Sequence, residues 1–221
     1  MQVERFLRFV LAVTLGLTVS SASFPAAPSI AQEAEDPNPT LGNEALSLPL
    51  LDVNAPDAEP TTLGGLRGAE GVVVVFLSNT CPYVLDWAER IPRLESQARE
   101  RDVGLVLVNS NARKRQATDS PEAMRAFAAG HLGELPYFLD ESSRLADALD
   151  AKRTPEAFLF DAEMRLVYRG PFDDHSGPFE NAQQHWLRDA IDSLGTELQA
   201  PESQPALGCA VQRPRRRRPA S

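Results

Sequence analysis

VVVVFLSNTCPYVLDW, at residues 72–87, is the stretch of sequence that decides the fold. Its first part, residues 72–76, consists of β-branched and aromatic residues, which suit a strand buried on both faces of a sheet. Apolar residues then recur at helical spacing, at Ala88, Ile91, Leu94 and Ala98. We therefore predict a buried strand, a short loop and a helix, with Cys81 where the helix begins.

Cys81 has the sequence context of a reactive thiol. Pro82 suits the first position of a helix, where its missing N–H costs nothing, so Cys81 falls near the N-cap. The backbone N–H groups and the dipole at this end favour an anion, and cysteines so placed can have a pKa of roughly 3.5 to 7.5 instead of about 8.5. The alternative is that Cys81 is a buried cysteine acting as a small apolar residue.

The N-terminus has the pattern of a secretory signal. Arg5 and Arg8 precede an apolar segment at 9–19, and small residues follow up to Ala31. We predict a signal peptide at 1–31, with an earlier cleavage site or an uncleaved anchor as alternatives. No other stretch is long enough to span a bilayer. The protein is therefore expected to be exported, to the periplasm or another extracytoplasmic compartment, where disulfides persist.

The remaining 190 or so of the 221 residues suit one domain between two tails. Residues 32–44 predict a flexible linker, residues 45–195 the folded domain, and residues 196–221 a disordered tail that carries Cys209 and an Arg run. The chain is acidic, with a formal net charge of −9. The Arg run suits anionic lipid or nucleic acid, or simply a solvated tail. No folded basic face with aromatic partners is visible, so we expect no nucleic-acid partner.

The order of predicted elements is that of an α/β domain. A strand at 103–108 follows the cysteine helix, so the two strands should be parallel. Ser120 and Pro121 are typical of a helix start. The other predicted elements are a strand at 46–53, a short helix near 62–66, an extended segment at 136–140, a brief helix ending at 149, a hairpin formed by 151–161 and 164–169, and a helix at 179–194.

This order resembles the thioredoxin-like superfamily, with the extra elements of the redoxins, from about Leu46 to Leu194. The resemblance rests on the strand–cysteine–helix stretch, on Thr154-Pro155 before the hairpin, and on the turn and return at 161–170. It implies a central mixed β-sheet flanked by helices, with a redoxin-type N-terminal strand and inserted elements. It also implies a cis Thr154–Pro155 bond beside Cys81, where both residues present backbone groups to an extended substrate.

Three shorter motifs resemble a group of exported bacterial redoxins with a Gly-Cys near the C-terminus: SNTCP at 78–82, NSNAR at 109–113 and LGC at 207–209. One departure matters. Oxidoreductases of the superfamily carry Cys-x-x-Cys, whereas this chain reads CPYV, with Val84 in place of the second cysteine. The usual resolving thiol is absent.

The sequence therefore predicts a thiol–disulfide oxidoreductase with Cys81 as the nucleophile. Exchange needs a second thiol to release the mixed disulfide, and Cys209 is the internal candidate. Its tether of about 15 residues can reach roughly 45 to 50 Å, so distance is no obstacle. The pair could equally form a structural disulfide, or Cys209 could be an unpaired or intermolecular thiol. Pro82 and Tyr83 are predicted to flank the substrate groove, and Trp87 to lie in the core.

Two other functions stay open. A redoxin scaffold without a second motif cysteine could bind peptides or partner proteins without turnover. A thiol peroxidase is less favoured, because Val74, Ser78 and Pro155 stand where peroxiredoxins have Pro, Thr and Arg. Protein or small-molecule thiols and disulfides are the expected partners. The histidines and the Asp173-Asp174-His175 cluster lack the spacing of a metal site, and no nucleotide motif appears, so we expect no metal and no cofactor.

Overall fold

The computed structural model describes residues 39–215. The predicted signal peptide at 1–31 and most of the Arg run lie outside the described residues. The strands are β1 (Pro49–Asp52), β2 (Thr61–Thr62), β3 (Gly71–Leu77), β4 (Val103–Asn109), β5 (Tyr137–Leu139), β6 (Arg153–Thr154), β7 (Glu156–Asp161), β8 (Leu166–Gly170) and β9 (Cys209–Ala210). The helices are α1 (Asn43–Leu46), α2 (Pro82–Trp87), α3 (Ile91–Glu100), α4 (Pro121–His131), α5 (Arg144–Ala148) and α6 (Trp186–Ser193). Short 3₁₀ helices are η1 (Leu63–Gly65), η2 (Ala88–Arg90), η3 (Ala112–Lys114) and η4 (Phe179–Asn181).

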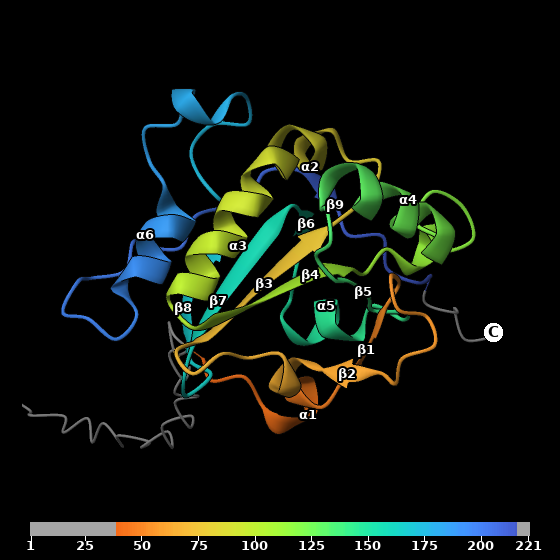
Figure 1. The fold of residues 1–221 in the computed structure, drawn as a ribbon, viewed down its shortest axis with the longest axis horizontal. Helices are drawn as coiled ribbons and strands as arrows, with labels where there is room; N and C mark the ends of the chain where they lie inside the picture. The colour runs from red at the N-terminus through yellow and green to blue at the C-terminus, as the bar shows by residue number, and fades with distance from the viewer. Residues whose placement is uncertain (1–38, 216–221) are drawn as a thin grey trace, which may run out of the picture. The chain divides into compact units, whose positions relative to one another are not determined.

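The central sheet has seven strands in the order β2-β1-β5-β4-β3-β7-β8 (Figure 1). The pairs β3–β4 and β4–β5 are parallel, and the other pairs of this sheet are antiparallel. This mixed sheet with helices on both faces confirms the predicted thioredoxin-like α/β fold. The parallel pairing of β3 with β4 and the β7–β8 hairpin are confirmed as well.

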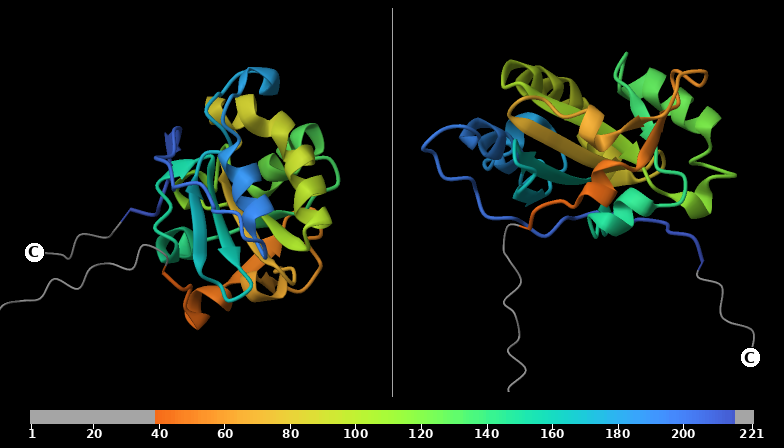
Figure 2. Two further views of the ribbon diagram at one scale, coloured as in Figure 1. Left: turned by 90° about the vertical axis from the view of Figure 1, so that its left-hand side faces the viewer. Right: turned by 90° about the horizontal axis from the view of Figure 1, so that it is seen from below.

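The two faces of the sheet are filled by alternate residues of the same strands. Val73 and Val75 of β3 pack under α2, α3, α4 and α6, whereas Val72, Val74 and Phe76 pack towards α1 and α5. All seven residues of β3 are buried, which explains its unbroken apolar sequence. Figure 2 shows the larger helices gathered on one side of the sheet. The carboxyl end of β3 delivers Cys81 to that side.

The cysteine helix and the last helix are both shorter than predicted. Pro92 has no N–H to donate to Ala88, so the chain passes through η2 and then resumes as α3. Before the last helix, the Asp174 carboxylate accepts the N–H groups of Gln183 and Gln184, which holds these two residues in a loop. The last α-helix consequently begins at Trp186 instead of residue 179.

Both predicted tails differ from expectation where the structure describes them. In the segment at 39–44, Thr40 forms a β-bridge with Arg165 of the hairpin. Residues 196–215 fold back onto the domain and form β9, so the prediction of a disordered tail was wrong for this part (Figure 2, right). No helix within residues 39–215 is long and apolar enough to cross a membrane.

Candidate functional site

Cys81 is the N-cap of α2, with extended backbone angles and Pro82 at the first helical position, as predicted. Its carbonyl accepts the N–H groups of Val84 and Leu85 at 2.9 and 3.1 Å, which starts the helix. The side chain is only 1% exposed. Its thiol donates to the backbone carbonyl of Thr154, with a sulfur–oxygen distance of 3.0 Å. The nucleophile candidate therefore lies against the loop that precedes the hairpin.

That loop is held in one conformation by a buried carboxylate. The Thr154–Pro155 peptide bond is cis, as the resemblance implied. Glu156, which is 2% exposed, accepts the N–H groups of Lys152 and Arg153 at 2.6 and 2.9 Å. The guanidinium of Arg169 neutralises it at 2.7 Å. Sequence reasoning missed Glu156; its only signal was an acidic residue at the start of an otherwise apolar strand.

Cys209 lies against Thr154, the residue whose carbonyl also contacts the Cys81 thiol. Strand β9 pairs with β6 so that Cys209 is opposite Thr154, and the Thr154 hydroxyl donates to the Cys209 carbonyl at 3.5 Å. Cys209 packs against the buried cluster that contains Cys81, and each thiol shifts the pKa of the other. Both are free thiols. The structure thus brings together two cysteines that are 128 positions apart in the sequence.

The residue before Cys209, Gly208, has to be a glycine. Its φ is +143°, and a Cβ there would lie 2.1 Å from the Thr154 carbonyl oxygen. Only glycine allows the two backbones to approach this closely. Asn111 adds a second attachment, because its side chain accepts the N–H of Gln212 at 2.8 Å and donates to the Leu77 carbonyl at 3.3 Å. The GC and NSNAR motifs therefore both serve to hold the C-terminal segment against the domain.

The two thiols have opposite pKa shifts. For Cys81, burial is the largest influence and raises the pKa, but hydrogen bonds from the Cys209 side chain, the Val84 and Cys209 backbones and the Thr154 side chain outweigh it and lower the pKa below 9.0. For Cys209, burial and then the neighbouring Cys81 raise the pKa to about 11. As the pH rises, Cys81 ionises first and Cys209 remains the protonated partner. The pair is thus polarised into a thiolate and a thiol donor.

Replacing Cys209 by alanine should raise the pKa of Cys81, because the Cys209 thiol is the largest influence that lowers it. The thiolate is the species that is alkylated, so the inflection of the iodoacetamide rate should move to higher pH. Cys209→Ser is the matched control, since its hydroxyl can still donate, and its inflection should shift less. An unchanged or lower inflection in Cys209→Ala would contradict this account of the pair.

A buried ion pair braces the helix that carries Cys81. Arg90 and Asp173 are 3% and 2% exposed, and the Arg90 Nε atom lies 2.5 Å from the carboxylate. Arg90 also donates to the carbonyls of His175 and Gly177 at 2.7 and 2.8 Å. The indole N–H of Trp87 donates to the same His175 carbonyl at 2.6 Å. The loop at 173–177 is therefore fixed to the end of α2.

The remaining residues considered for the site differ in their exposure to solvent. Pro82 and Tyr83 are exposed next to Cys81, with Tyr83 39% exposed. Trp87 is buried and stacks on Phe172, as expected of a core residue. Within residues 39–215, no group of three or more His, Cys, Asp or Glu side chains could hold a metal ion.

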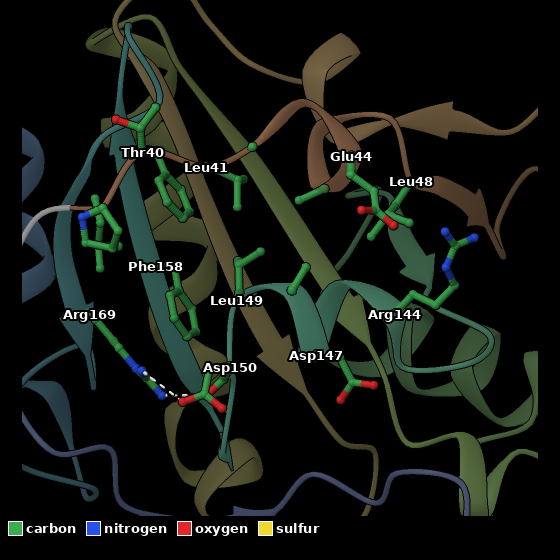
Figure 3. A pocket seen from close by; sticks show the side chains of 16 residues that line it. Thr40, Leu41, Glu44, Leu48, Arg144, Asp147, Leu149, Asp150, Phe158 and Arg169 are labelled. Atoms are coloured by element: carbon green, nitrogen blue, oxygen red, sulfur yellow. Dashed lines mark hydrogen bonds and ion pairs between the residues drawn. The ribbon is translucent and has the colours of Figure 1, made fainter. Parts of the chain in front are cut away.

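A separate cavity of about 710 Å³ opens on the other face of the sheet (Figure 3). Phe158, Leu149 and Leu41 line it, and Arg169 and Asp150 meet at its rim. Neither cysteine lines this cavity. Arg169 connects the two regions, because it also pairs with the Glu156 carboxylate that holds the loop beside Cys81.

The fold and the thiol site define a thioredoxin-like protein with one cysteine at the helix start and a second on the C-terminal segment. The chain belongs to the redoxin family, whose model matches residues 27–185. No curated protein matches it.

Two solved structures are similar over most of the chain. An uncharacterized conserved protein from Geobacillus kaustophilus is 30% identical, with a TM-score of 0.67, over 82% of this chain and 94% of that one. A hypothetical protein from Sinorhizobium meliloti 1021 is 29% identical, with a TM-score of 0.67, over 79% and 95% of the two chains. A third structure, of a secreted disulfide oxidoreductase of Mycobacterium tuberculosis, is 16% identical, with a TM-score of 0.49, over 69% of this chain and 100% of that one.

Proposed function

We propose that this redoxin catalyses thiol–disulfide exchange, with Cys81 as the nucleophile and Cys209 as the resolving thiol. The observation that carries the proposal is that both cysteines lie against Thr154: the Cys81 thiol donates to its carbonyl, and Cys209 pairs with it in the β6–β9 ladder. It supplies in space the second thiol that CPYV lacks in sequence. Pro82 and Tyr83 form the exposed rim that contacts the substrate. Thr154 and Pro155 keep the two cysteines in position next to each other.

The reaction has two steps. The Cys81 thiolate attacks one sulfur of a substrate disulfide, which forms a mixed disulfide and releases the other half as a thiolate. Cys209 then loses its proton and attacks the Cys81 sulfur, which closes the Cys81–Cys209 bond and releases the second half. The two protons of the protein thiols pass to the two substrate thiolates. The substrate disulfide is reduced and the protein dithiol is oxidised, and an external dithiol restores the protein.

Replacing Cys81 by serine should abolish the exchange. The reduced protein, incubated with excess hydroxyethyl disulfide, should lose the mass of two hydrogen atoms, measured by intact mass spectrometry under non-reducing conditions. Cys81→Ser should keep its original mass or gain one adduct at Cys209, slowly, because burial raises the pKa of Cys209. Exchange at the unmodified rate in Cys81→Ser would refute the role of Cys81.

Export is the second part of the proposal, and the signal-like pattern at 1–31 supports it. Mass spectrometry of the protein recovered from the periplasmic fraction of its host tests this. We expect a mature chain that begins at Gln32. An intact N-terminal segment on protein found only in the cytoplasm would contradict it.

A further inference from the structure

The backbone edge beside Cys81, which an extended peptide would use, is occupied by the chain itself. Extended peptides bind by adding a strand to an open sheet edge. Here β9 is already paired with Arg153 and Thr154, and the N–H of Val211 donates to the Lys152 carbonyl at 3.1 Å. Val211 is 8% exposed. A peptide could pair with this edge only after β9 had left it.

The C-terminal segment is also fastened beyond β9. Gln212 is bonded through its N–H to Asn111 and through its carbonyl to the N–H of Arg113, at 2.8 and 2.9 Å. Arg213 donates to the carbonyls of Ala146 and Ala151 at 3.0 and 2.7 Å. Displacing β9 would break these bonds together. A small molecule needs no backbone edge, so it does not compete with β9 for this pairing.

Two positive charges lie against the residues that precede the two cysteines. The Lys114 ammonium lies 3.3 Å from the hydroxyl of Thr80, the residue before Cys81. The guanidinium of Arg153 lies 3.4 Å from the carbonyl of Gly208, the residue before Cys209.

No ion pair found within residues 39–215 involves Lys114 or Arg153. Lys114 is partly exposed and Arg153 is exposed. On a chain whose net charge is −9, two unpaired cations beside the reactive sulfurs form a local positive site.

We infer that the substrate is a small anionic disulfide, one whose two halves carry carboxylates, and that Lys114 and Arg153 select it. This inference deepens the proposed function and rests on it. The chemistry is the two-step exchange given above. The two cations hold the carboxylates while Cys81 attacks, and they favour the thiolate that leaves, because it is an anion too.

The test compares three disulfides of similar size and different charge: those of mercaptopropionate (anionic), mercaptoethanol (neutral) and cysteamine (cationic). Second-order rate constants for oxidation of the full reduced protein are measured at low salt. The quantity compared between proteins is the ratio of the anionic to the neutral rate constant, so that intrinsic differences between leaving groups cancel. In the Lys114→Gln/Arg153→Gln variant, this ratio should fall about tenfold, and high salt should reduce the difference between the proteins.

The control variant is Arg99→Gln/Arg165→Gln, which changes the net charge equally. Both arginines are exposed, each is paired with an acidic residue, and both lie near the opposite end of β3. Its ratio should equal that of the unmodified protein.

An equal fall in the control variant, or no fall in the test variant, would overturn the inference while the proposed function stood. Faster reduction of an unfolded protein's disulfides than of the anionic disulfide would do the same. If the unmodified protein reduced none of these disulfides, the proposed function itself would fail.

Discussion

Cys209→Ala is expected to stop the reaction of Cys81 at the mixed disulfide. Without Cys209, nothing within the chain can attack the Cys81 sulfur, since these are the only two cysteines. Without added reductant, the variant should release one substrate thiol per molecule and then stall, whereas the unmodified protein releases two. Intact mass spectrometry should show the Cys81 adduct accumulating. Cys209→Ser should stall as well, because its hydroxyl cannot resolve a disulfide.

Gly208→Ala tests the same step with both thiols kept. The added Cβ would lie 2.1 Å from the Thr154 carbonyl oxygen, so β9 has to move away from β6 and take Cys209 with it. Misplacement by about 1 Å can slow a reaction between positioned groups roughly 100-fold, so closure of the Cys81–Cys209 bond should slow by a factor of that order.

Gly130→Ala is the matched control for this substitution. Gly130 lies in α4, and nothing is within 4 Å of its added Cβ. Closure should proceed at the unmodified rate. If Gly208→Ala closed as fast as this control, the close approach of β9 to Thr154 would not be what positions Cys209.

The second large effect is expected on stability. Arg90→Ala leaves the Asp173 carboxylate buried and unpaired, and removing one partner of such a pair costs about 3–5 kcal/mol. This is a large part of the total stability of a domain, which is about 5–15 kcal/mol. The free energy of unfolding of the reduced protein in urea, extrapolated to water, measures the loss. Because Arg90 fixes the end of α2, alkylation of Cys81 should also become faster as its burial loosens.

Arg93→Ala is the control for this prediction. Arg93 is exposed on the same helical segment and lies over the Phe179 ring, 4.5 Å from its centroid. Such a contact contributes about 0.5–1 kcal/mol. A loss in Arg90→Ala no larger than that in Arg93→Ala would mean that the buried ion pair contributes little.

The parts of the fold that the sequence predicts correctly are those with strong apolar periodicity. The unbroken run in β3 and the proline after Cys81 predict the strand and the N-cap. Ser120 caps α4 as its position indicates, by accepting the N–H of Ala123 at 3.2 Å. These features depend on residues that are adjacent in sequence, so local patterns carry them.

The packing of the C-terminal segment could not be predicted in this way. Residues 196–215 are rich in proline and polar residues and bury one apolar side chain deeply, that of Val211. Their attachment depends on backbone hydrogen bonds and on polar side chains such as Asn111 and Arg213, none of which produces a hydrophobic periodicity in the sequence. Gly208 was the one local signal, and its meaning depends on Thr154, 54 positions away. The sequence therefore predicted Cys81 as a site residue but could offer Cys209 only as a candidate.

The central claim is that Cys81 and Cys209 form a reversible disulfide, and a thiol map of the mature protein tests it most directly. The protein is equilibrated in graded glutathione buffers, its free thiols are alkylated, and each cysteine peptide is read under non-reducing conditions. We expect an intramolecular Cys81–Cys209 bond in oxidising buffers that opens as the buffer becomes more reducing. Mixed disulfides with glutathione and no Cys81–Cys209 bond in any buffer would contradict the claim, as would a bond that stays closed in the most reducing one.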